Sequence, residues 1–262
     1  MPAVDLLRGG RVKDALASLE GEVRKDPSSS RHRVFLFQLL SLMGSWERAA
    51  TQLNVAGQLD AKALPMVQTY RTALNCEAFR GSVFAGERSP LVFGDPEEWI
   101  ARLLEALRLT AAGKHAEAER LRETALDQAP ATRGKLDGED FQWIADADSR
   151  LGPVCEAIVN GKYYWVPFHR LKAVQIEAPV DLRDWVWMPA QLTFANGGES
   201  VALIPTRYPG SEAHADDMIR TARKTEWNQV AEGTFLGLGQ RMYATDAGER
   251  PLMDARRIDL DG

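Results

Sequence analysis

A glycine followed five residues later by an alanine occurs three times in the first half of this 262-residue chain, and no other feature constrains the fold as strongly. The first two copies are 34 residues apart, and the three pairs are Gly10 with Ala15, Gly44 with Ala49, and Gly113 with Ala118. Glycine allows a sharp turn between two helices, and alanine allows the two helices to pack closely. We therefore predict helical hairpins whose alanines lie where the helices touch.

Proline follows two of these copies and is expected to end the second helix of each hairpin, because it cannot continue a helix. Pro27 and Pro130 each lie twelve residues after the alanine of their copy. A 34-residue period with glycine, alanine and proline in this order resembles the tetratricopeptide repeat. The copies are degenerate, since Ala61 replaces the second proline and Arg122 replaces the large apolar residue of the third copy. An array of helical repeats is the prediction, and an irregular helical bundle is the alternative.

Local signals place individual helices in this half. Apolar residues recur at helical spacing in residues 11–23, and residues 31–44 are apolar on nearly every side, so both faces of that second helix should be covered. The three serines at 28–30 offer it an N-cap. A loop is expected at 86–99, which contains two prolines, and Asp95 is expected to cap the helix that follows.

The second half has the composition of a β-rich region. Five of the seven tryptophans lie beyond residue 140, and β-branched and aromatic residues alternate between turn signals. The elements expected here are hairpins that turn at 196–198 and at 246–249, a strand at 183–190, and an amphipathic helix at 211–224. Trp185 and Trp187 should lie on one face of their strand, and Ser211 should cap the helix.

The two halves together predict an α+β fold. A tetratricopeptide-like helical-repeat domain is expected over residues 1–136, followed by a β-rich, mostly antiparallel domain over residues 137–262. The boundary falls in the polar, glycine-containing segment 132–140, which has the composition of a linker.

Residues 160–176 contain three consecutive aromatic residues, Tyr163, Tyr164 and Trp165. Side chains alternate along a strand, so Tyr163 and Trp165 should face one side and Tyr164 the other, with Pro167 ending the regular pairing. A run of aromatics can also be a stacking platform for nucleic-acid bases. The net charge of −5 and the lack of basic clusters argue against that alternative, so we expect a structural strand and no nucleic-acid partner.

Motifs that would carry catalysis or bind a metal are missing from the sequence. The four histidines are scattered, the two cysteines are isolated, and no CxxC, HExxH, P-loop or GxSxG motif occurs. We therefore predict no catalytic residues, no metal and no cofactor. The lack of an apolar run of about 18 residues and of a signal peptide, together with the isolated thiols, predicts a cytoplasmic protein without a membrane partner.

Three segments of the second half stand out by their order: GKYYWVPF at 161–168, RDWVWMPA at 183–190 and LIPTRYPGSE at 203–212. Together they resemble the ImpE family, also called TagJ, whose members are accessory proteins of bacterial type VI secretion. The resemblance covers essentially the whole chain and is specific in its second half. It implies a helical-repeat domain joined to a β-rich domain. It also implies a non-enzymatic adaptor that binds the small subunit of the contractile sheath and the ClpV-type ATPase and modulates sheath disassembly.

The residues alone leave two other classes of function open. The aromatic-rich β region could form the pocket of an enzyme, a hydrolase or a transferase, and the repeats could bind peptides unrelated to secretion. An enzyme should show perturbed titratable groups in a deep pocket, whereas an adaptor should show a shallow apolar groove.

The concave face of a helical array is the expected binding surface, because stacked repeats form a curved surface that accepts a peptide or a helix. The first helix of each repeat normally lines this face. The candidate partner-binding residues are therefore Phe35, Gln38 and Leu39 in the second repeat and Arg102, Glu105 and Leu109 in the third. Core packing is the alternative for Phe35 and Leu39, and a helix site in the β-rich domain is the alternative for the whole set.

Overall fold

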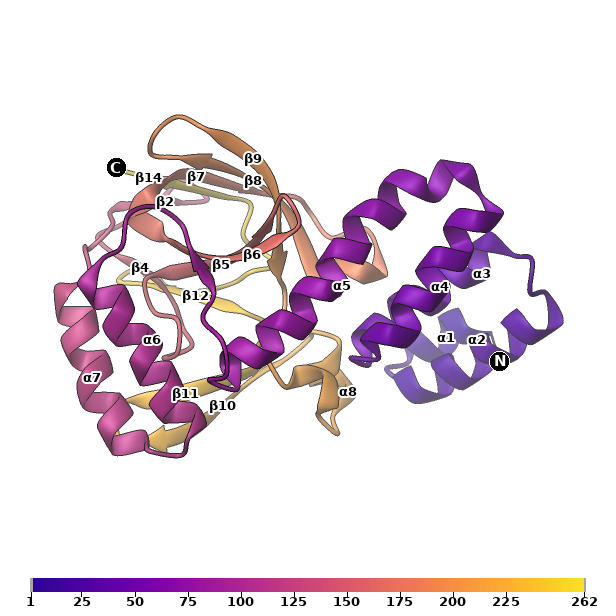
Figure 1. Ribbon diagram of the computed structural model, residues 1–262, viewed down its shortest axis with the longest axis horizontal. Helices are drawn as coiled ribbons and strands as arrows, with labels where there is room; N and C mark the ends of the chain where they lie inside the picture. The colour runs from indigo at the N-terminus through magenta and orange to yellow at the C-terminus, as the bar shows by residue number, and fades with distance from the viewer. Residues whose placement is uncertain (1, 262) are drawn as a thin grey trace.

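The computed structural model describes residues 2–261 and has an N-terminal helical region followed by a β-rich, mostly antiparallel region (Figure 1). This order of elements confirms the predicted α+β fold class. The helices are α1 Ala3–Arg8, α2 Val12–Lys25, α3 Ser30–Leu42, α4 Trp46–Leu59, α5 Leu64–Phe84, α6 Glu98–Ala111 and α7 His115–Gln128. The shorter helical turns are η1 Ala61–Ala63, η2 Phe168–Arg170, η3 Leu182–Trp185, η4 Ser211–Ala213 and α8 Asp217–Arg220.

The repeated glycines form the turns of helical hairpins, as the sequence predicts. Gly10, Gly44 and Gly113 join α1 to α2, α3 to α4 and α6 to α7, with φ values of 73°, 66° and 75°. A residue with a Cβ is strained in this left-handed conformation, so glycine is the residue that fits. The matching alanines are all fully buried: Ala15, Ala49 and Ala118.

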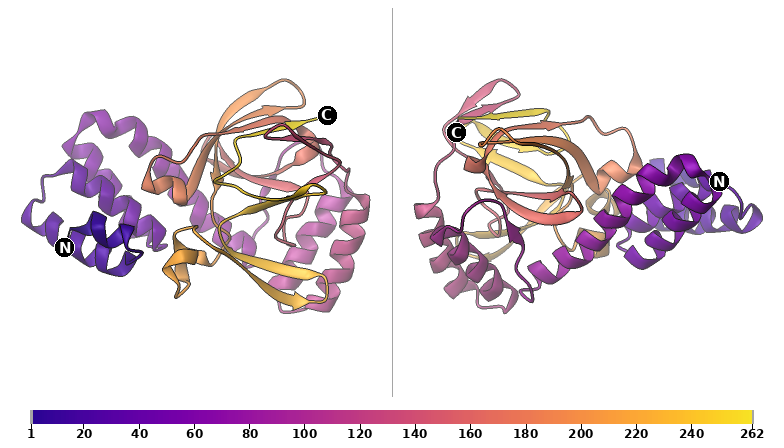
Figure 2. Two further views of the ribbon diagram at one scale, coloured as in Figure 1. Left: turned by 180° about the vertical axis from the view of Figure 1, so that it is seen from behind. Right: turned by 45° about the horizontal axis from the view of Figure 1, so that its top comes forward.

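The helices form two groups that α5 joins. The first group, α1–α4, packs at one end of the molecule, and α6 and α7 pack beside the β-rich region at the other end (Figures 1 and 2). α5 has 21 residues and runs from the first group to the sheet. The third copy of the repeat does not stack directly on the second, because the chain between α5 and α6 carries a strand, β1 (Leu91–Val92), that pairs with β6 (Lys162–Pro167).

The largest sheet of the described residues has nine strands, in the order β1-β6-β5-β9-β8-β7-β14-β2-β3. Its other strands are β2 Gly134–Leu136, β3 Glu139–Phe141, β5 Val154–Val159, β7 Leu171–Ile176, β8 Trp187–Phe194, β9 Glu199–Pro205 and β14 Arg257–Leu260. A three-stranded sheet contains β4 Ile144–Asp146, β12 Met242–Thr245 and β13 Gly248–Pro251, and a separate hairpin contains β10 Thr225–Ala231 and β11 Thr234–Gly239. The predicted hairpins at 196–198 and 246–249 are confirmed by β8–β9 and β12–β13.

The aromatic stretch forms β6 and is a structural strand. Tyr163 and Trp165 are buried on the side that packs against two phenylalanines of α5, with ring centroids 6.1 and 6.3 Å apart. Tyr164 lies on the other side, where its ring centroid is 6.4 Å from that of Phe93. The predicted alternation is confirmed, and the strand ends at Pro167.

Two predictions in the β-rich region are wrong because long-range pairing decides the local structure. Segment 132–140 does not form a free linker but supplies β2 and β3 of the main sheet. Gly134 fits there because a Cβ would lie 2.0 Å from the carbonyl oxygen of Asp259 on the neighbouring strand. Trp185 ends the turn η3 and Trp187 begins β8, so the two tryptophans do not share a strand. The division of the chain into domains at residue 136 stays a prediction.

Two predicted helix caps are also wrong, because both side chains have other roles. Ser211 begins the short turn η4, and its Oγ donates to the carbonyl oxygen of Tyr208 at 2.6 Å, so only α8 remains of the expected helix at 211–224. Asp95 does not cap α6, because that helix begins three residues later, after Glu97. The carboxylate of Glu97 accepts a 2.7 Å hydrogen bond from Arg170, which ties the start of α6 to the β-rich region.

Candidate functional site

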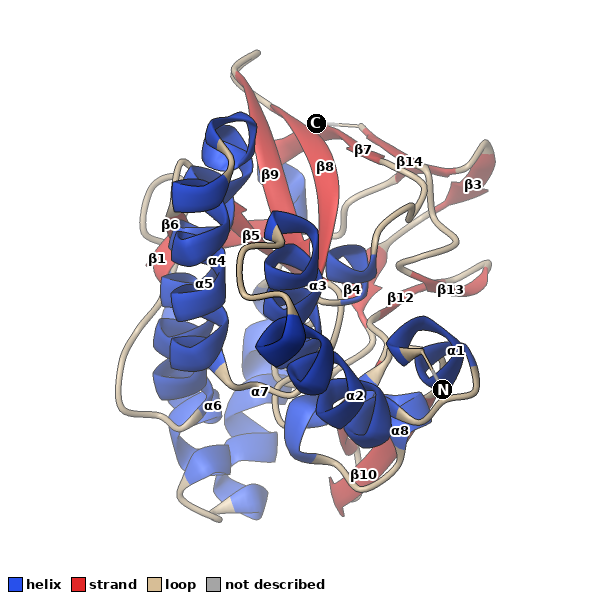
Figure 3. Cartoon of the chain, turned by 90° about the vertical axis from the view of Figure 1, so that its right-hand side faces the viewer, coloured by secondary structure: helices blue, strands red, loops and turns tan. Residues whose placement is uncertain are grey.

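A groove of about 860 Å³ lies at the helical end of the molecule. Its walls come from α1 and α3, which are the first helices of their hairpins, from Glu22 of α2, from η1 with the start of α5, and from η3 of the β-rich region with the residue before it. Figure 3 looks onto this end of the molecule and shows α3 between α2 and α5. The volume lies within the range of ligand pockets, about 300–1,000 Å³.

The lining of the groove combines apolar and charged side chains. The apolar residues are Pro2, Ala3, Val4, Val34, Phe35, Ala63 and Met66. The charged residues and the histidine are Glu22, Arg31, His32, Asp60, Lys62, Asp181 and Arg183. A lining that contains both apolar and charged side chains suits one face of an amphipathic helix, whose own apolar stripe is bordered by polar residues.

The β-rich region closes one side of this groove through Asp181. Gln38 on α3 donates a hydrogen bond of 2.6 Å from Nε2 to Oδ1 of Asp181. Asp181 is itself fixed, because it forms a reciprocal capping box with Asp184 at the start of η3. The groove is therefore complete only when the helical region and the β-rich region are folded together.

An aromatic cluster packs behind α3 and supports the groove. Trp187 lies against Tyr70 and Phe37, with ring centroids 5.6 and 6.5 Å away. The guanidinium of Arg183 lies 4.8 Å from the centroid of the Tyr70 ring. Burial raises the pKa of Tyr70 to about 12, although the charge of Arg183 acts in the opposite direction. Tyr70 is therefore a neutral phenol at physiological pH.

Several polar groups at the groove lack a partner within the described chain. The side chains of Arg31 and Lys62 make no ion pair with residues 2–261. Nε of Arg183 and Nδ1 of His32 are buried and have no hydrogen-bond partner there. A buried polar atom left without a partner costs about 1–3 kcal/mol. Carboxylates or carbonyl groups of an incoming chain would provide acceptors for the exposed side chains of Arg31 and Lys62.

Three of the candidate residues lie on α3, and two of them line the groove. Phe35 is half-buried and Gln38 is mostly buried, and both border the groove directly. Leu39 is fully buried in the helical core and does not reach it. Leu39 belongs to the hydrophobic core that α3 shares with the helices packed against it.

The other three candidate residues lie on α6, outside the groove. Arg102 is half-buried and hydrogen bonds to Gln128 and Glu98 on its own helical hairpin. Glu105 and Leu109 line a separate depression of about 330 Å³ between the end of α5 and α6. The strand β1 and its loop separate this hairpin from the first group of helices, so these residues and Phe35 do not belong to one surface.

Other lining residues were missed by reasoning from the sequence. Lys62 lies on η1 and Met66 on α5. These elements follow the second hairpin, so α5 occupies the position that the first helix of a further repeat would take, as α1 and α3 do in the first two. The signal that could have found them is the position of α5 directly after the second hairpin. Asp181 and Arg183 had no such signal, because they come from the β-rich region and reach the groove only through the tertiary fold.

A buried ion network fixes α5 to the sheet and so sets the position of the helical end. Arg80 on α5 donates to both carboxylate oxygens of Glu156 on β5, at 2.7 and 3.0 Å. Arg241 donates to Glu156 as well, and to Asp146. Burial alone would raise the pKa of Glu156, but the guanidinium groups of Arg80 and Arg241 outweigh it and lower the pKa to about 2.

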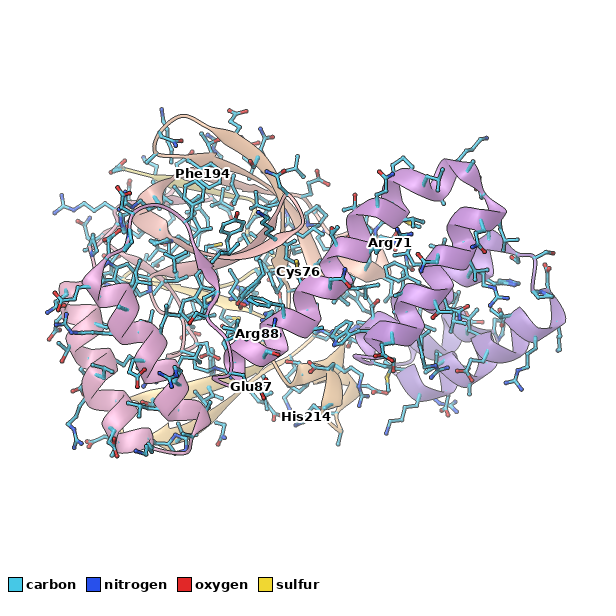
Figure 4. The ribbon with its side chains drawn as sticks, in the orientation of Figure 1. Arg71, Cys76, Glu87, Arg88, Phe194 and His214 are labelled. Atoms are coloured by element: carbon cyan, nitrogen blue, oxygen red, sulfur yellow. The ribbon has the colours of Figure 1, made fainter. Side chains whose placement is uncertain are left out.

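Two further contacts tie the helices to the β-rich region. Arg207 is buried and donates from Nη1 to the carbonyl oxygen of Leu42 at 2.8 Å, at the C-terminus of α3, where a positive charge stabilises the helix dipole. Burial lowers the pKa of Arg207 to about 10, so the side chain remains charged at neutral pH. Cys76, labelled on α5 in Figure 4, lies 3.4 Å from the carbonyl oxygen of Gly161 on the β-rich side.

On the aromatic strand of the β-rich region, Trp165 is fully buried against α5. A cavity at its far side, lined by residues that include Phe141 and Arg250, is about 70 Å³, which is well below the size of common ligand pockets. Within residues 2–261, no group of three or more His, Cys, Asp or Glu side chains is placed to hold a metal ion. No helix of that part of the chain has the length and apolar character needed to cross a membrane.

Comparisons with known proteins find similarity over the whole chain. A family model described as ImpE protein matches residues 138–259. The chain is 54% identical over 261 residues to the type VI secretion system accessory component TagJ of Pseudomonas aeruginosa, and the match covers 100% of this chain and 92% of that protein. The crystal structure of a Vibrio parahaemolyticus protein is 23% identical and has a TM-score of 0.91, covering 99% of this chain and 97% of that one, so the fold is shared.

Proposed function

Because this chain belongs to the ImpE family of type VI secretion accessory components, we propose that it acts as a non-enzymatic adaptor of the contractile sheath. In this proposal it works in the cytoplasm, binds a terminal helix of the small sheath subunit and also binds the ClpV-type ATPase. By holding both partners it modulates the disassembly of the sheath.

The observation that carries the proposal is the groove between α1, α3 and η3. A bound amphipathic helix would place apolar side chains, spaced three and four residues apart, against Phe35 and Met66. Polar residues that flank this stripe would meet Arg31 and Lys62, which have no ion-pair partner among residues 2–261. Anchoring through three or four apolar side chains gives an affinity near the micromolar range, about −8 kcal/mol.

The ATPase is assigned to the adaptor by the family resemblance, and its binding surface lies outside the groove in this proposal. An adaptor must hold both partners together, so one surface cannot serve both. The geometry of the β-rich region gives no support to the alternative of an enzyme, because its aromatic strand is covered by α5.

The test is a calorimetric titration of the intact protein with a synthetic peptide of the terminal helix of the small sheath subunit. The result expected is one binding site with a dissociation constant near the micromolar range. A scrambled peptide of the same composition should not bind. Lack of binding by the native peptide, together with unchanged sheath disassembly by the ATPase when the protein is omitted, would refute the adaptor function.

A further inference from the structure

The hairpin of β10 and β11 lies outside the hydrophobic core. Among residues 2–261, its two strands pair only with each other, and none of its apolar side chains is buried or belongs to either cluster of core residues. Its largest side chain, Trp227, packs on Tyr208 with ring centroids 5.6 Å apart and is still 37% exposed. The hairpin runs alongside α6 and α7 (Figures 1 and 2). An isolated two-stranded hairpin is only marginally stable, so its contacts with the rest of the molecule decide where it lies.

Polar contacts hold the hairpin against segment 148–149, which precedes β5. The N–H of Phe235 donates to Oγ of Ser149 at 2.9 Å, and the carbonyl oxygen of Phe235 accepts from the N–H of Ser149 at 3.0 Å. The N–H of Gly237 donates to Oδ2 of the buried Asp148 at 2.7 Å. Water replaces such bonds when a contact opens, so their net contribution to the closed arrangement is modest.

The charge of Arg122 lies beneath the tip of the hairpin. Arg122 is buried, and it occupies the position that the fully buried Leu19 and Leu53 hold in the first two copies of the repeat. Its guanidinium donates to the hydroxyl groups of Thr234 on β11 and Thr110 on α6, at 2.8 and 2.9 Å. It makes no ion pair with residues 2–261, and its Nε has no hydrogen-bond partner there.

A buried guanidinium without a paired carboxylate favours release of the hairpin. Taking a cation out of water is costly unless an opposite charge compensates for the lost hydration. The charges of Asp148 and Glu119 act on Arg122, but burial outweighs them and lowers the pKa of Arg122. Release of β11 would return this guanidinium to water, so the gain in hydration offsets part of the cost of opening.

The base of the hairpin is anchored more firmly than its length. The N–H of Gln240 donates to the carbonyl oxygen of Lys224 at 3.0 Å, and Nε2 of Gln240 donates to the carbonyl oxygen of Ala222 at 2.8 Å. Ala222 is buried and has a φ of 54°, a left-handed conformation that is uncommon for a residue with a Cβ. Gly239, at the end of β11, has a φ of 89°. Left-handed residues therefore flank the two strands at this fixed base.

We propose that β10 and β11 form a strap that detaches from α7 and from segment 148–149 as one unit, turns about its base at Ala222 and Gly239, and exposes Arg122 to water. The nine-stranded sheet stays folded when the strap opens, because the strap contributes nothing to its core. This device is separate from the groove at the helical end and does not depend on the proposed adaptor function.

The test is hydrogen exchange of backbone amides in the intact protein, followed by NMR. The amides of Phe235 and Gly237 report on the strap, because their acceptors lie outside the hairpin. Both should exchange through one opening event, at least about tenfold faster than the hydrogen-bonded amides of β5, which exchange only when the sheet unfolds.

Two variants separate the charge of Arg122 from its hydrogen bonds. Thr234→Val removes an acceptor of Arg122 and keeps the shape of the side chain, so exchange of Phe235 and Gly237 should become about tenfold faster. Arg122→Met combined with Thr234→Val also removes the buried charge, so both amides should exchange about tenfold more slowly than in the unmodified protein. Thr193→Val on β8 is the matched control and should leave both rates unchanged.

The double variant gives the decisive result. If it exchanged faster than the unmodified protein, Arg122 would hold the hairpin in place and the proposal would be overturned. Exchange of Phe235 and Gly237 at the rate of β5 would also overturn it, because the hairpin would then open only when the whole protein unfolds. A change confined to one of the two amides would contradict opening as a unit.

Discussion

Gln38 on α3 and Asp181 before η3 are 143 residues apart in the sequence, and Nε2 of Gln38 donates a 2.6 Å hydrogen bond to Oδ1 of Asp181. The bond joins a helix of the N-terminal hairpins to a turn of the β-rich region. Both residues line the same groove. The shape of the proposed binding site therefore depends on contacts between the two regions and not on the helical array alone.

Loss of this bond should be measurable in the stability of the protein. Gln38→Leu should lower the free energy of unfolding by about 1–3 kcal/mol, because the carboxylate of Asp181 loses a partly buried donor. Urea denaturation measures the change. Gln191→Leu is the control, since Gln191 donates to Glu199 on the exposed surface and should change stability by less than about 0.5 kcal/mol. Equal effects would contradict a structural role of the bond between Gln38 and Asp181.

The contact between α3 and α4 depends on the small side chain of Ala49, which is fully buried. Ala49→Arg should abolish the cooperative thermal transition or lower its midpoint by at least about 10 °C, because a long charged side chain cannot enter this contact. The same substitution at Ala101, which is exposed on α6, should leave the midpoint nearly unchanged. A thermal scan of both variants measures these midpoints. If Ala49→Arg unfolded at the same temperature as the unmodified protein, the close helix packing inferred from the repeat would be refuted.

The burial of Trp165 between β6 and α5 predicts a large effect of its removal. Trp165→Ala should lower the free energy of unfolding by about 3–5 kcal/mol, since the side chain is fully buried and leaves a cavity. Denaturant titration provides the measurement. Trp143→Ala is the control, because Trp143 is exposed, and it should lower the free energy of unfolding much less. If Trp165→Ala kept full stability and lost binding of a ligand, β6 would be a binding site and not a structural strand.

The buried carboxylate of Glu156 should make stability depend on pH in the acid range. Its folded pKa of about 2 lies below the ordinary value of about 4.3, so the carboxylate stabilises the fold above pH 4.3. This contribution should be lost as the pH falls from about 4.3 to about 2. Glu156→Gln should lower the free energy of unfolding at pH 7 by about 3–5 kcal/mol, because Arg80 and Arg241 lose their shared partner.

The measurement is denaturant unfolding of Glu156→Gln and the unmodified protein between pH 7 and pH 2. The difference between the two proteins should shrink below pH 4, since the carboxylate is then progressively neutralised in the unmodified protein too. Glu139→Gln removes an exposed ion pair with Arg250 and should show a difference of less than about 1 kcal/mol at any pH. A constant difference for Glu156→Gln across this range would contradict the lowered pKa.

Local sequence patterns were sufficient for the helical hairpins and for the alternation along β6. The glycines at 10, 44 and 113 are required by the backbone of each turn, so their spacing alone reveals the hairpins. Local patterns did not predict that Trp185 lies in the turn η3 while Trp187 lies in β8. The turn η3 is fixed by the capping box of Asp181 and Asp184, which competes with the alternating pattern.

The candidate site was only partly predictable because its walls come from distant segments. Phe35 and Gln38 followed from the rule that first helices line the concave face, whereas Arg102 and its neighbours on α6 did not share that surface. The insertion that carries β1 separates α6 from the first hairpins, and strand pairing with β6 fixes it there. Asp181 and Arg183 reach the groove through the packing of η3 on α3, which no periodicity in the sequence encodes.

The most direct test of the groove as the helix-binding site is the affinity of the sheath-helix peptide for Phe35→Arg, measured by calorimetry beside Leu59→Arg. Phe35 lines the groove, while Leu59 is similarly apolar, 42% exposed and outside it. Phe35→Arg should weaken binding at least about thirtyfold, because it removes a central apolar anchor, and Leu59→Arg should leave the affinity within about twofold. Equal affinities of both variants and the unmodified protein would contradict the placement of the helix in this groove.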